Sequence, residues 1–217
     1  MAIGDRSRNI RQNVMGAVRD PSGLGAAQVE VVYDSINRVQ RRIAEESECL
    51  EERFDITTFS GQELYMLPTD FLRERVLIPS ASSVPIKKID MGEMSSIKRI
   101  HNQTSFSNAS TPDIFYYYKW NGQMGLIDSA GNAPSQSSVV SLYYWRYPNS
   151  TNETVSDVID PIVDPRWDTC LFYGAVADIT ADPKWWGLFE AEIMRQRMVE
   201  RTNQAESGKV PVTQDYE

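Results

Sequence analysis

The sequence predicts an α+β fold, in which helices from both ends of the chain form a bundle, an antiparallel β lobe is inserted between them, and an extended C-terminal arm follows. Three observations support this prediction. Apolar residues recur at steps of three and four in the first part of the chain, aromatic and β-branched runs separated by turn residues fill the middle, and two Asp-Pro pairs introduce helical periodicity near the end. The expected divisions are residues 1–52, 53–148, 149–204 and 205–217.

The first division contains two expected helices, over Asp5–Val18 and from Ala26 to about Leu50. The apolar stripe of the longer helix consists of Val29, Val32, Tyr33, Ile36, Val39, Gln40 and Ile43. Its other face carries acid–base pairs at i,i+4 spacing, which are Asp34 with Arg38, Arg41 with Glu45, and Arg42 with Glu46. A long helix with one apolar stripe packs along a neighbour.

The middle of the chain is expected to be mostly β-strand. The predicted strands cover residues 54–59, 63–67, 75–78, 114–120, 125–128 and 139–147. Ser60-Gly61-Gln62 predicts a turn that returns the first strand into the second, and Asn121-Gly122 is a strong hairpin signal. A short helix is expected over 89–100 and a polar loop over 101–112. The last strand is apolar on both faces, so it is expected between two layers or against a partner subunit.

Two further helices are expected after a polar linker. Asp164-Pro165 and Asp182-Pro183 each provide an N-cap followed by a proline at the first helical position, and the first of these helices is expected to end near Ala181. Small residues in that helix allow another helix to approach closely; they are Gly174, Ala175 and Ala177. Asp178 lies on its apolar side, where a hydrogen bond to a neighbouring helix or subunit is favoured over a metal-ligand role.

The composition excludes a broad basic surface for nucleic acid. The formal net charge is -8, from 22 Lys and Arg against 30 Asp and Glu. Phosphate binding needs clusters of Lys and Arg, whereas an acidic chain beside DNA repels it and limits adhesion.

The cysteines and the hydropathy pattern give no sign of secretion or membrane insertion. Cys49 and Cys170 lack metal-site spacing, fall in predicted helices and are expected to be buried thiols, with a disulfide as the alternative. No run of apolar residues is long enough to span a bilayer, and the first residues lack the apolar core of a signal peptide.

No pattern of catalytic, cofactor-binding or metal-binding residues is found. His101 is the single histidine, and it falls in the predicted polar loop. Ser22-Gly23-Leu24-Gly25 lacks the last glycine of a dinucleotide fingerprint and follows a helix instead of a strand. We therefore expect a structural protein and no enzyme, no cofactor and no bound metal.

Two groups of residues are candidates for interaction. Acidic residues cluster at the expected end of the long helix, where they are either a solvated helix end or the lining of a lumen; they are Glu45, Glu46, Glu48, Glu51 and Glu52. Aromatic residues gather in two strands, as Tyr116, Tyr117, Tyr118 and Trp120, and as Tyr143, Tyr144, Trp145 and Tyr147. Core packing plus a subunit interface is favoured for the aromatic residues, and sugar or base stacking is the alternative.

Several segments together resemble the bacteriophage head–tail adaptor proteins, and most closely the head-completion or tail accessory type of short-tailed phages. The resemblance rests on four stretches, which are the helix end Ile36-Asn37-Arg38-Val39-Gln40-Arg41-Arg42-Ile43, the segment Leu64-Tyr65-Met66-Leu67-Pro68-Thr69-Asp70-Phe71-Leu72-Arg73, the aromatic strand Ser141–Pro148, and Asp164-Pro165-Arg166-Trp167 through Gly174-Ala175-Val176-Ala177. Their order also agrees, over roughly residues 26–200.

The resemblance implies a ring, typically twelvefold, beneath the portal protein at the head–tail junction of the virion, assembled from chains made in the host cytoplasm. Such a ring extends the channel for double-stranded DNA, helps to retain the genome and offers a platform to tail nozzle, tube or fibre proteins. A C-terminal arm would dock on the portal, with Gln204, Lys209, Val210, Val212 and Tyr216 as candidates. Candidates for the subunit or tail interface are Tyr116, Tyr118, Trp120, Tyr143, Trp145 and Tyr147. Candidates for the channel surface are Glu45, Glu48, Glu51 and Glu52.

Two other functions remain open on the sequence alone. A carbohydrate-binding or tail-fibre module would use the aromatic β region, although the long terminal helices are unusual for such modules. A hydrolase would require a site around His101, without any recognisable nucleophile motif.

Overall fold

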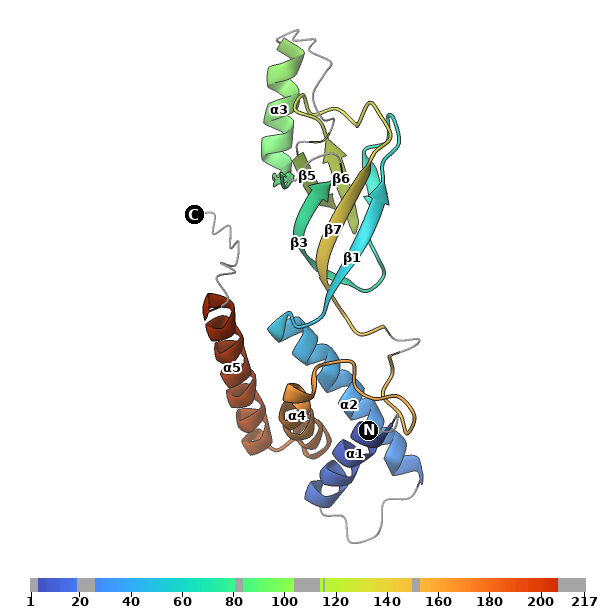
Figure 1. The fold of residues 1–217 in the computed structure, drawn as a ribbon, viewed down its shortest axis with the longest axis vertical. Helices are drawn as coiled ribbons and strands as arrows, with labels where there is room; N and C mark the ends of the chain where they lie inside the picture. The colour runs from blue at the N-terminus through green and yellow to red at the C-terminus, as the bar shows by residue number, and fades with distance from the viewer. Residues whose placement is uncertain are drawn as a thin grey trace. The chain divides into compact units, whose positions relative to one another are not determined.

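A computed structural model of the protein describes residues 4–18, 26–80, 84–103, 114, 116–149 and 153–206. The chain forms two units, a helical unit of residues 1–50 and 147–217 and a β unit of residues 51–146 (Figure 1). Both termini belong to the helical unit. The predicted α+β class is confirmed, with helices from both ends of the chain and sheets formed between them.

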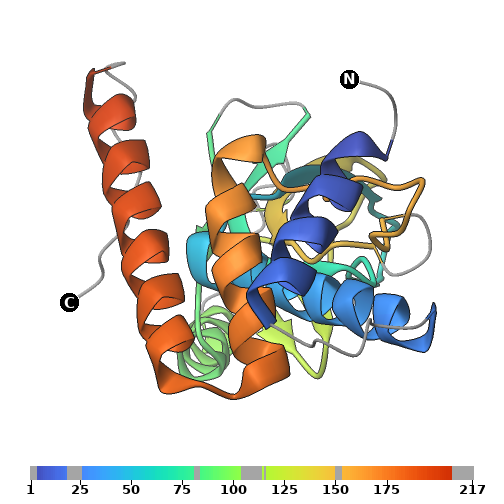
Figure 2. The same ribbon diagram turned by 90° about the horizontal axis from the view of Figure 1, so that it is seen from below.

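The helical unit is built from α1 (Asp5–Val18), α2 (Ala26–Ser47), a 3-10 turn η1 (Pro165–Trp167), α4 (Asp168–Thr180) and α5 (Pro183–Glu206). Helix α4 lies between α1 and α5, and α2 crosses and contacts α4 (Figure 2). The core of the helical unit combines the predicted stripe of α2 with apolar residues of α4 and α5. The fully buried members of the α2 stripe are Ile36 and Ile43, with Val32 and Val39 almost as well covered.

Helix α2 ends three residues earlier than predicted. Its last residue is Ser47, and Glu48 adopts a left-handed conformation with φ of 53° that redirects the chain. The predicted pair between Asp34 and Arg38 is also wrong, because Arg38 reaches across to α4 and binds Asp178 with an Nη2–Oδ2 distance of 2.6 Å. The i,i+4 pairs of Arg41 and Arg42 with Glu45 and Glu46 are present.

The C-terminal helices begin where the Asp-Pro pairs predicted. Asp164 accepts a hydrogen bond from the Arg166 amide at 3.0 Å, and Asp182 accepts one from the Lys184 amide at 2.9 Å. Helix α4 ends at Ala181 in a left-handed conformation. The role expected for Asp178 is confirmed, since its Oδ2 accepts a hydrogen bond from Ser35 of α2 at 2.7 Å.

The small residues of α4 let two helices approach it. A Cβ atom at Gly174 would lie 2.5 Å from Cγ1 of Val39 in α2 and 2.9 Å from Cδ2 of Phe189 in α5. Only a glycine fits where these three helices meet, which confirms the predicted close approach.

The β unit contains two sheets and one helix. Its strands are β1 (Glu51–Thr57), β2 (Leu64–Met66), β3 (Phe71–Pro79), β4 (Lys87–Lys88), β5 (Tyr116–Trp120), β6 (Gln123–Ile127) and β7 (Val139–Arg146), and its helix is α3 (Met91–Gln103). One sheet has the order β1-β7-β3 and the other β2-β6-β5-β4. Apolar side chains of both sheets form one core, and α3 covers the other face of the four-stranded sheet (Figure 1).

The observed strand pairs differ in part from the hairpins predicted from neighbouring segments of the sequence. The hairpin predicted from β1 to β2 is wrong, because β1 pairs with β7 and β2 pairs with β6, both antiparallel. The Asn121-Gly122 hairpin between β5 and β6 is confirmed. Strand β7, for which the sequence predicts a place between two layers or against a partner subunit, is the central strand of its sheet.

Helix α3 extends further than predicted. Asp90 Oδ1 accepts a hydrogen bond from the Glu93 amide at 2.7 Å, and Glu93 Oε2 accepts one from the Asp90 amide at 3.1 Å, so a reciprocal capping box fixes its start. The helix ends at Gln103, so His101 lies in a helix and the predicted loop over 101–112 is wrong at its first three residues. Residues 104–113 lie outside the described part of the chain.

Both cysteines are free thiols. The predicted burial is confirmed for Cys170 but not for Cys49, which is partly exposed. Cys170 is buried in α4, and burial raises the pKa of its thiol to about 12. Cys49 was expected in a helix but follows the last residue of α2.

Candidate functional site

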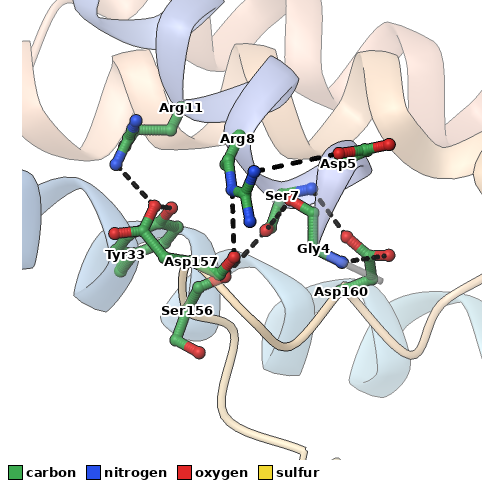
Figure 3. A network of polar contacts seen from close by, with 9 residues as sticks. All are labelled: Gly4, Asp5, Ser7, Arg8, Arg11, Tyr33, Ser156, Asp157 and Asp160. Atoms are coloured by element: carbon green, nitrogen blue, oxygen red, sulfur yellow. Dashed lines mark hydrogen bonds and ion pairs between the residues drawn. The ribbon is translucent and has the colours of Figure 1, made fainter. Parts of the chain in front are cut away.

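A polar network fastens the first helix of the helical unit to the segment 153–164 (Figure 3). Asp160 accepts hydrogen bonds from the backbone amides of Gly4 at 3.2 Å and Ser7 at 2.8 Å. These amides belong to the first turn of α1, where they have no partner within the helix. A carboxylate from about 150 residues further along the chain therefore acts as the N-terminal cap of α1.

Asp157 forms the second half of this network. Its Oδ1 accepts hydrogen bonds from Nη1 of Arg11 and from the hydroxyl of Tyr33, both at 2.7 Å, and its carbonyl accepts one from Arg8 (Figure 3). Gly4 has a φ of +86°, and a Cβ atom there would lie 2.3 Å from the carbonyl oxygen of Asp157. The network thus requires both the left-handed backbone and the missing side chain of Gly4.

Replacing Asp160 with alanine is expected to lower the free energy of unfolding by about 1–2 kcal/mol, because two amides of α1 lose their cap. In this variant, amide hydrogen exchange should become faster in α1, whereas the exchange rates of α2 and α4 should change less. The matched control is Asp34→Ala on the exposed face of α2, which should change the free energy by about 0.5 kcal/mol or less. Equal losses from both substitutions would contradict the capping role.

Alkaline pH is expected to destabilise the protein. Burial and the hydrogen bond to Asp157 raise the pKa of Tyr33 from 10.0 to about 12. Burial also raises the pKa values of Tyr118 and Tyr144, which donate to Glu63 and Asp70. Each folded-state pKa lies above the unfolded one, so the contribution is fully present below pH 10 and is lost as pH rises from there through the folded pKa. Urea unfolding at a series of alkaline pH values should show this decline, and Tyr33→Phe should make it shallower; an unchanged slope would refute the assignment to Tyr33.

The four acidic residues considered for a channel do not share one helix end. Glu45 lies on α2, 3.9 Å from Nε of Arg41, and Glu48 forms the turn that ends the helix. Glu51 and Glu52 belong to β1 instead, since the chain enters β pairing with β7 at residue 51. They form ion pairs with arginines of the β unit, Glu51 with Arg75 and Glu52 with Arg146.

The candidate aromatic residues of β5 are divided between the core and the surface. Tyr118 is buried beneath α3, where its hydroxyl donates to Glu63, and Tyr116 packs against the same small core. Trp120 ends the strand with 53% of its surface exposed.

The two candidate aromatic residues of β7 lie under cations. Arg53 lies over the ring of Tyr143 and Arg75 over that of Trp145, with centroid distances of 6.0 and 5.5 Å. Tyr147 belongs to the helical unit, with Arg41 4.4 Å from its ring centroid. The structure therefore does not bring the six aromatic side chains into one exposed platform.

The candidate arm residues are mostly beyond the described part of the chain. Gln204 lies in the last turns of α5, which continues to Glu206. Lys209, Val210, Val212 and Tyr216 lie outside the described residues.

The negative charge is concentrated in one unit. Asp and Glu outnumber Lys and Arg by 20 to 13 in the helical unit but only by 10 to 9 in the β unit. Of the net charge of -8, the helical unit therefore carries -7.

Comparison with protein families identifies the chain. A family model described as SU10 adaptor protein matches residues 9–214, which is nearly the whole sequence. The chain belongs to this family of phage adaptor proteins. No curated protein matches the adaptor.

Membership makes the adaptor a structural protein of a bacteriophage virion that interacts with head and tail components. Within the described residues, no group of three or more His, Cys, Asp or Glu side chains is arranged to hold a metal ion. No described helix combines the length and apolar character needed to cross a bilayer.

The network around Asp157 and Asp160 is the feature of the adaptor that sequence reasoning missed. A signal for it exists in α1, which carries Arg6, Arg8 and Arg11 but only one acidic residue, Asp5. Arg6 binds Asp168 and the carbonyl of Pro161, so all three arginines bind the same later segment.

Proposed function

We propose that the protein forms a ring beneath the portal, extends the DNA channel and provides the attachment platform for the tail. The single observation that carries the proposal is the adaptor family match over residues 9–214. The ring is expected to contain twelve subunits and to lie at the head–tail junction of the virion. Its subunits are made in the host cytoplasm. Its partners are further copies of itself, the portal protein, and a tail nozzle, tube or fibre protein.

The charge distribution supports a channel role for the helical unit. A wall with an excess of carboxylates repels phosphate groups, so double-stranded DNA slides past without binding. The proposed channel residues are Glu45 and Glu48, which belong to the helical unit and contribute to this excess, and Glu51 and Glu52 at the start of β1 in the β unit. Changing all four to lysine should slow genome ejection from assembled particles, because lysines bind the DNA backbone. The same change at four other exposed carboxylates, Glu30, Asp34, Asp55 and Glu190, is the control.

The tail-side contact is assigned to aromatic side chains that their own chain leaves accessible. Trp120 is the strongest candidate because it is more than half exposed. Tyr143 and Trp145 remain partly accessible beneath their arginines, whereas Tyr118 is covered by α3. Aromatic and arginine side chains are enriched where protein surfaces bury each other.

The test is reconstitution with the portal protein encoded by the same phage. Cryo-electron microscopy of the mixture, and of the virion, should reveal a ring of this chain directly below the portal. A chain ending at Glu206 should fail to bind the portal, because it lacks residues 207–217, which are most of the proposed docking arm of residues 205–217. Location of the chain elsewhere in the particle, or full portal binding by the shortened chain, would refute the corresponding part of the proposal.

A further inference from the structure

Helix α5 carries a second apolar face in addition to the one that it buries. Phe189, Ile193 and Gln196 face the core of the helical unit and are at most 7% exposed. About half a helical turn away, at steps of four, three and four, lie Gly187, Ala191, Met194 and Met198. We call these four residues the outer stripe. Met194 and Met198 are 64% and 68% exposed, whereas a helix at the surface of a monomer normally has one apolar stripe.

The described side chains in the C-terminal half of α5 also receive little support from their own unit. After Gln196, every side chain that the structure describes is exposed, although the helix continues to Glu206. A helical stretch of this length is marginal in water without packing. Both observations indicate that another surface covers this part of α5.

The outer stripe is complementary to itself when two copies of α5 run antiparallel. If the pair is centred between residues 193 and 194, Met198 of the second copy lies level with the space between Gly187 and Ala191. The two Met194 side chains then meet at the centre. Gly187 offers room for this arrangement, because a Cβ atom there would meet no described atom within 4 Å beyond its chain neighbours and the adjacent backbone of α5. Large side chains therefore fill the spaces left by small ones along the whole stripe.

The charges beside the stripe select the same arrangement. Glu190 and Arg197 lie on one flank of the outer stripe, and both are exposed. An antiparallel pair brings like flanks together, so in this register Glu190 lies level with Arg197 of the second copy, and Arg197 with its Glu190. A parallel pair would bring this flank against the opposite flank of the second copy, so Glu190 and Arg197 would not meet across the contact. Among the described residues, Glu190 forms a loose ion pair with Arg42, with an Nη2–Oε1 distance of 3.8 Å.

From this double complementarity we infer that α5 binds α5 of a second copy in a twofold, antiparallel homodimer contact. The occupant of the outer stripe is thus the protein itself. Such a contact uses the same surface on both subunits, whereas a ring is closed by head-to-tail contacts between two different surfaces. The inference is therefore independent of the proposed ring, and it describes how the free protein covers its exposed methionines.

The first test is analytical ultracentrifugation of the full-length chain over a range of concentrations. The wild type should dimerise, and Met198→Glu should weaken the dimer at least about tenfold, because it places a charge in an apolar contact. The matched control is Val31→Glu on α2, at a position that is 49% exposed and apolar but outside the stripe. Far-UV circular dichroism checks that both variants remain folded.

A charge exchange tests the register and the self-pairing together. Glu190→Arg alone and Arg197→Glu alone each place like charges opposite each other, so each variant should dimerise at least about tenfold more weakly than the wild type. An equimolar mixture of the two variants restores opposite charges at both positions and should regain dimerisation. A wild type that stays monomeric, a mixture that does not recover, or a stripe that binds only a head or tail protein would overturn the inference.

Discussion

Trp167→Ala is expected to lower the free energy of unfolding by about 3–5 kcal/mol. Trp167 is the largest fully buried side chain of the protein and lies at the junction of η1 and α4. Removing its indole leaves a cavity among helices that already pack closely around Gly174, so the surrounding side chains have little freedom to close it. Its Nε1 has no hydrogen-bond partner within the described residues, so the loss includes no broken hydrogen bond.

The matched control is the same substitution at Trp120, whose side chain is more than half exposed at the end of β5. Trp120→Ala should change the free energy of unfolding by about 0.5 kcal/mol. Urea titrations followed by far-UV circular dichroism measure both variants. A cost of less than about 1 kcal/mol for Trp167→Ala would contradict the packing described for the helical unit.

The helices could be predicted from the sequence because their signals are local. Asp164 and Asp182 each cap a helix through an amide two residues away, and the stripe of α2 contains its own periodicity. The end of α2 was missed, because nothing in the residue type of Glu48 indicates a left-handed backbone. The sequence places Asp34 four residues before Arg38, but Arg38 binds Asp178 instead. Asp178 is 140 positions away in the chain, so i,i+4 spacing does not reveal this contact.

Strand pairing and the polar network depend on residues far apart in the chain. The turn after β1 predicted a hairpin with β2, yet β1 pairs with β7, whose residues lie some 80 to 94 positions later. Likewise, no spacing rule links Asp160 with the amides of Gly4 and Ser7. Local patterns in a single sequence show which residues are apolar or charged. They do not show which distant partners these residues meet in the fold.

Gly125→Val is expected to cost about 3 kcal/mol in the β unit, although valine normally favours strands over glycine. A Cβ atom at Gly125 would lie 2.2 Å from Cε1 and Cζ of Tyr118 on the neighbouring strand. Tyr118 cannot turn aside without loss, because its ring is buried beneath α3 and its hydroxyl donates to Glu63, which also binds Lys98. The substitution therefore displaces a buried ring and breaks a polar contact at the same time.

A double-mutant cycle with Tyr118→Ala separates this clash from a general intolerance of β6 to side chains. Once the ring is absent, Gly125→Val has space, so its cost should fall by about 2 kcal/mol relative to the same change in the wild type. Hydrogen exchange should show the single variant losing protection in β5 and β6, while α2 and α4 of the helical unit keep theirs, because the two units have separate cores. An equal cost in both backgrounds would mean that the position requires glycine for a reason other than the ring of Tyr118. A simultaneous loss of protection in both units would instead show that their stabilities are coupled.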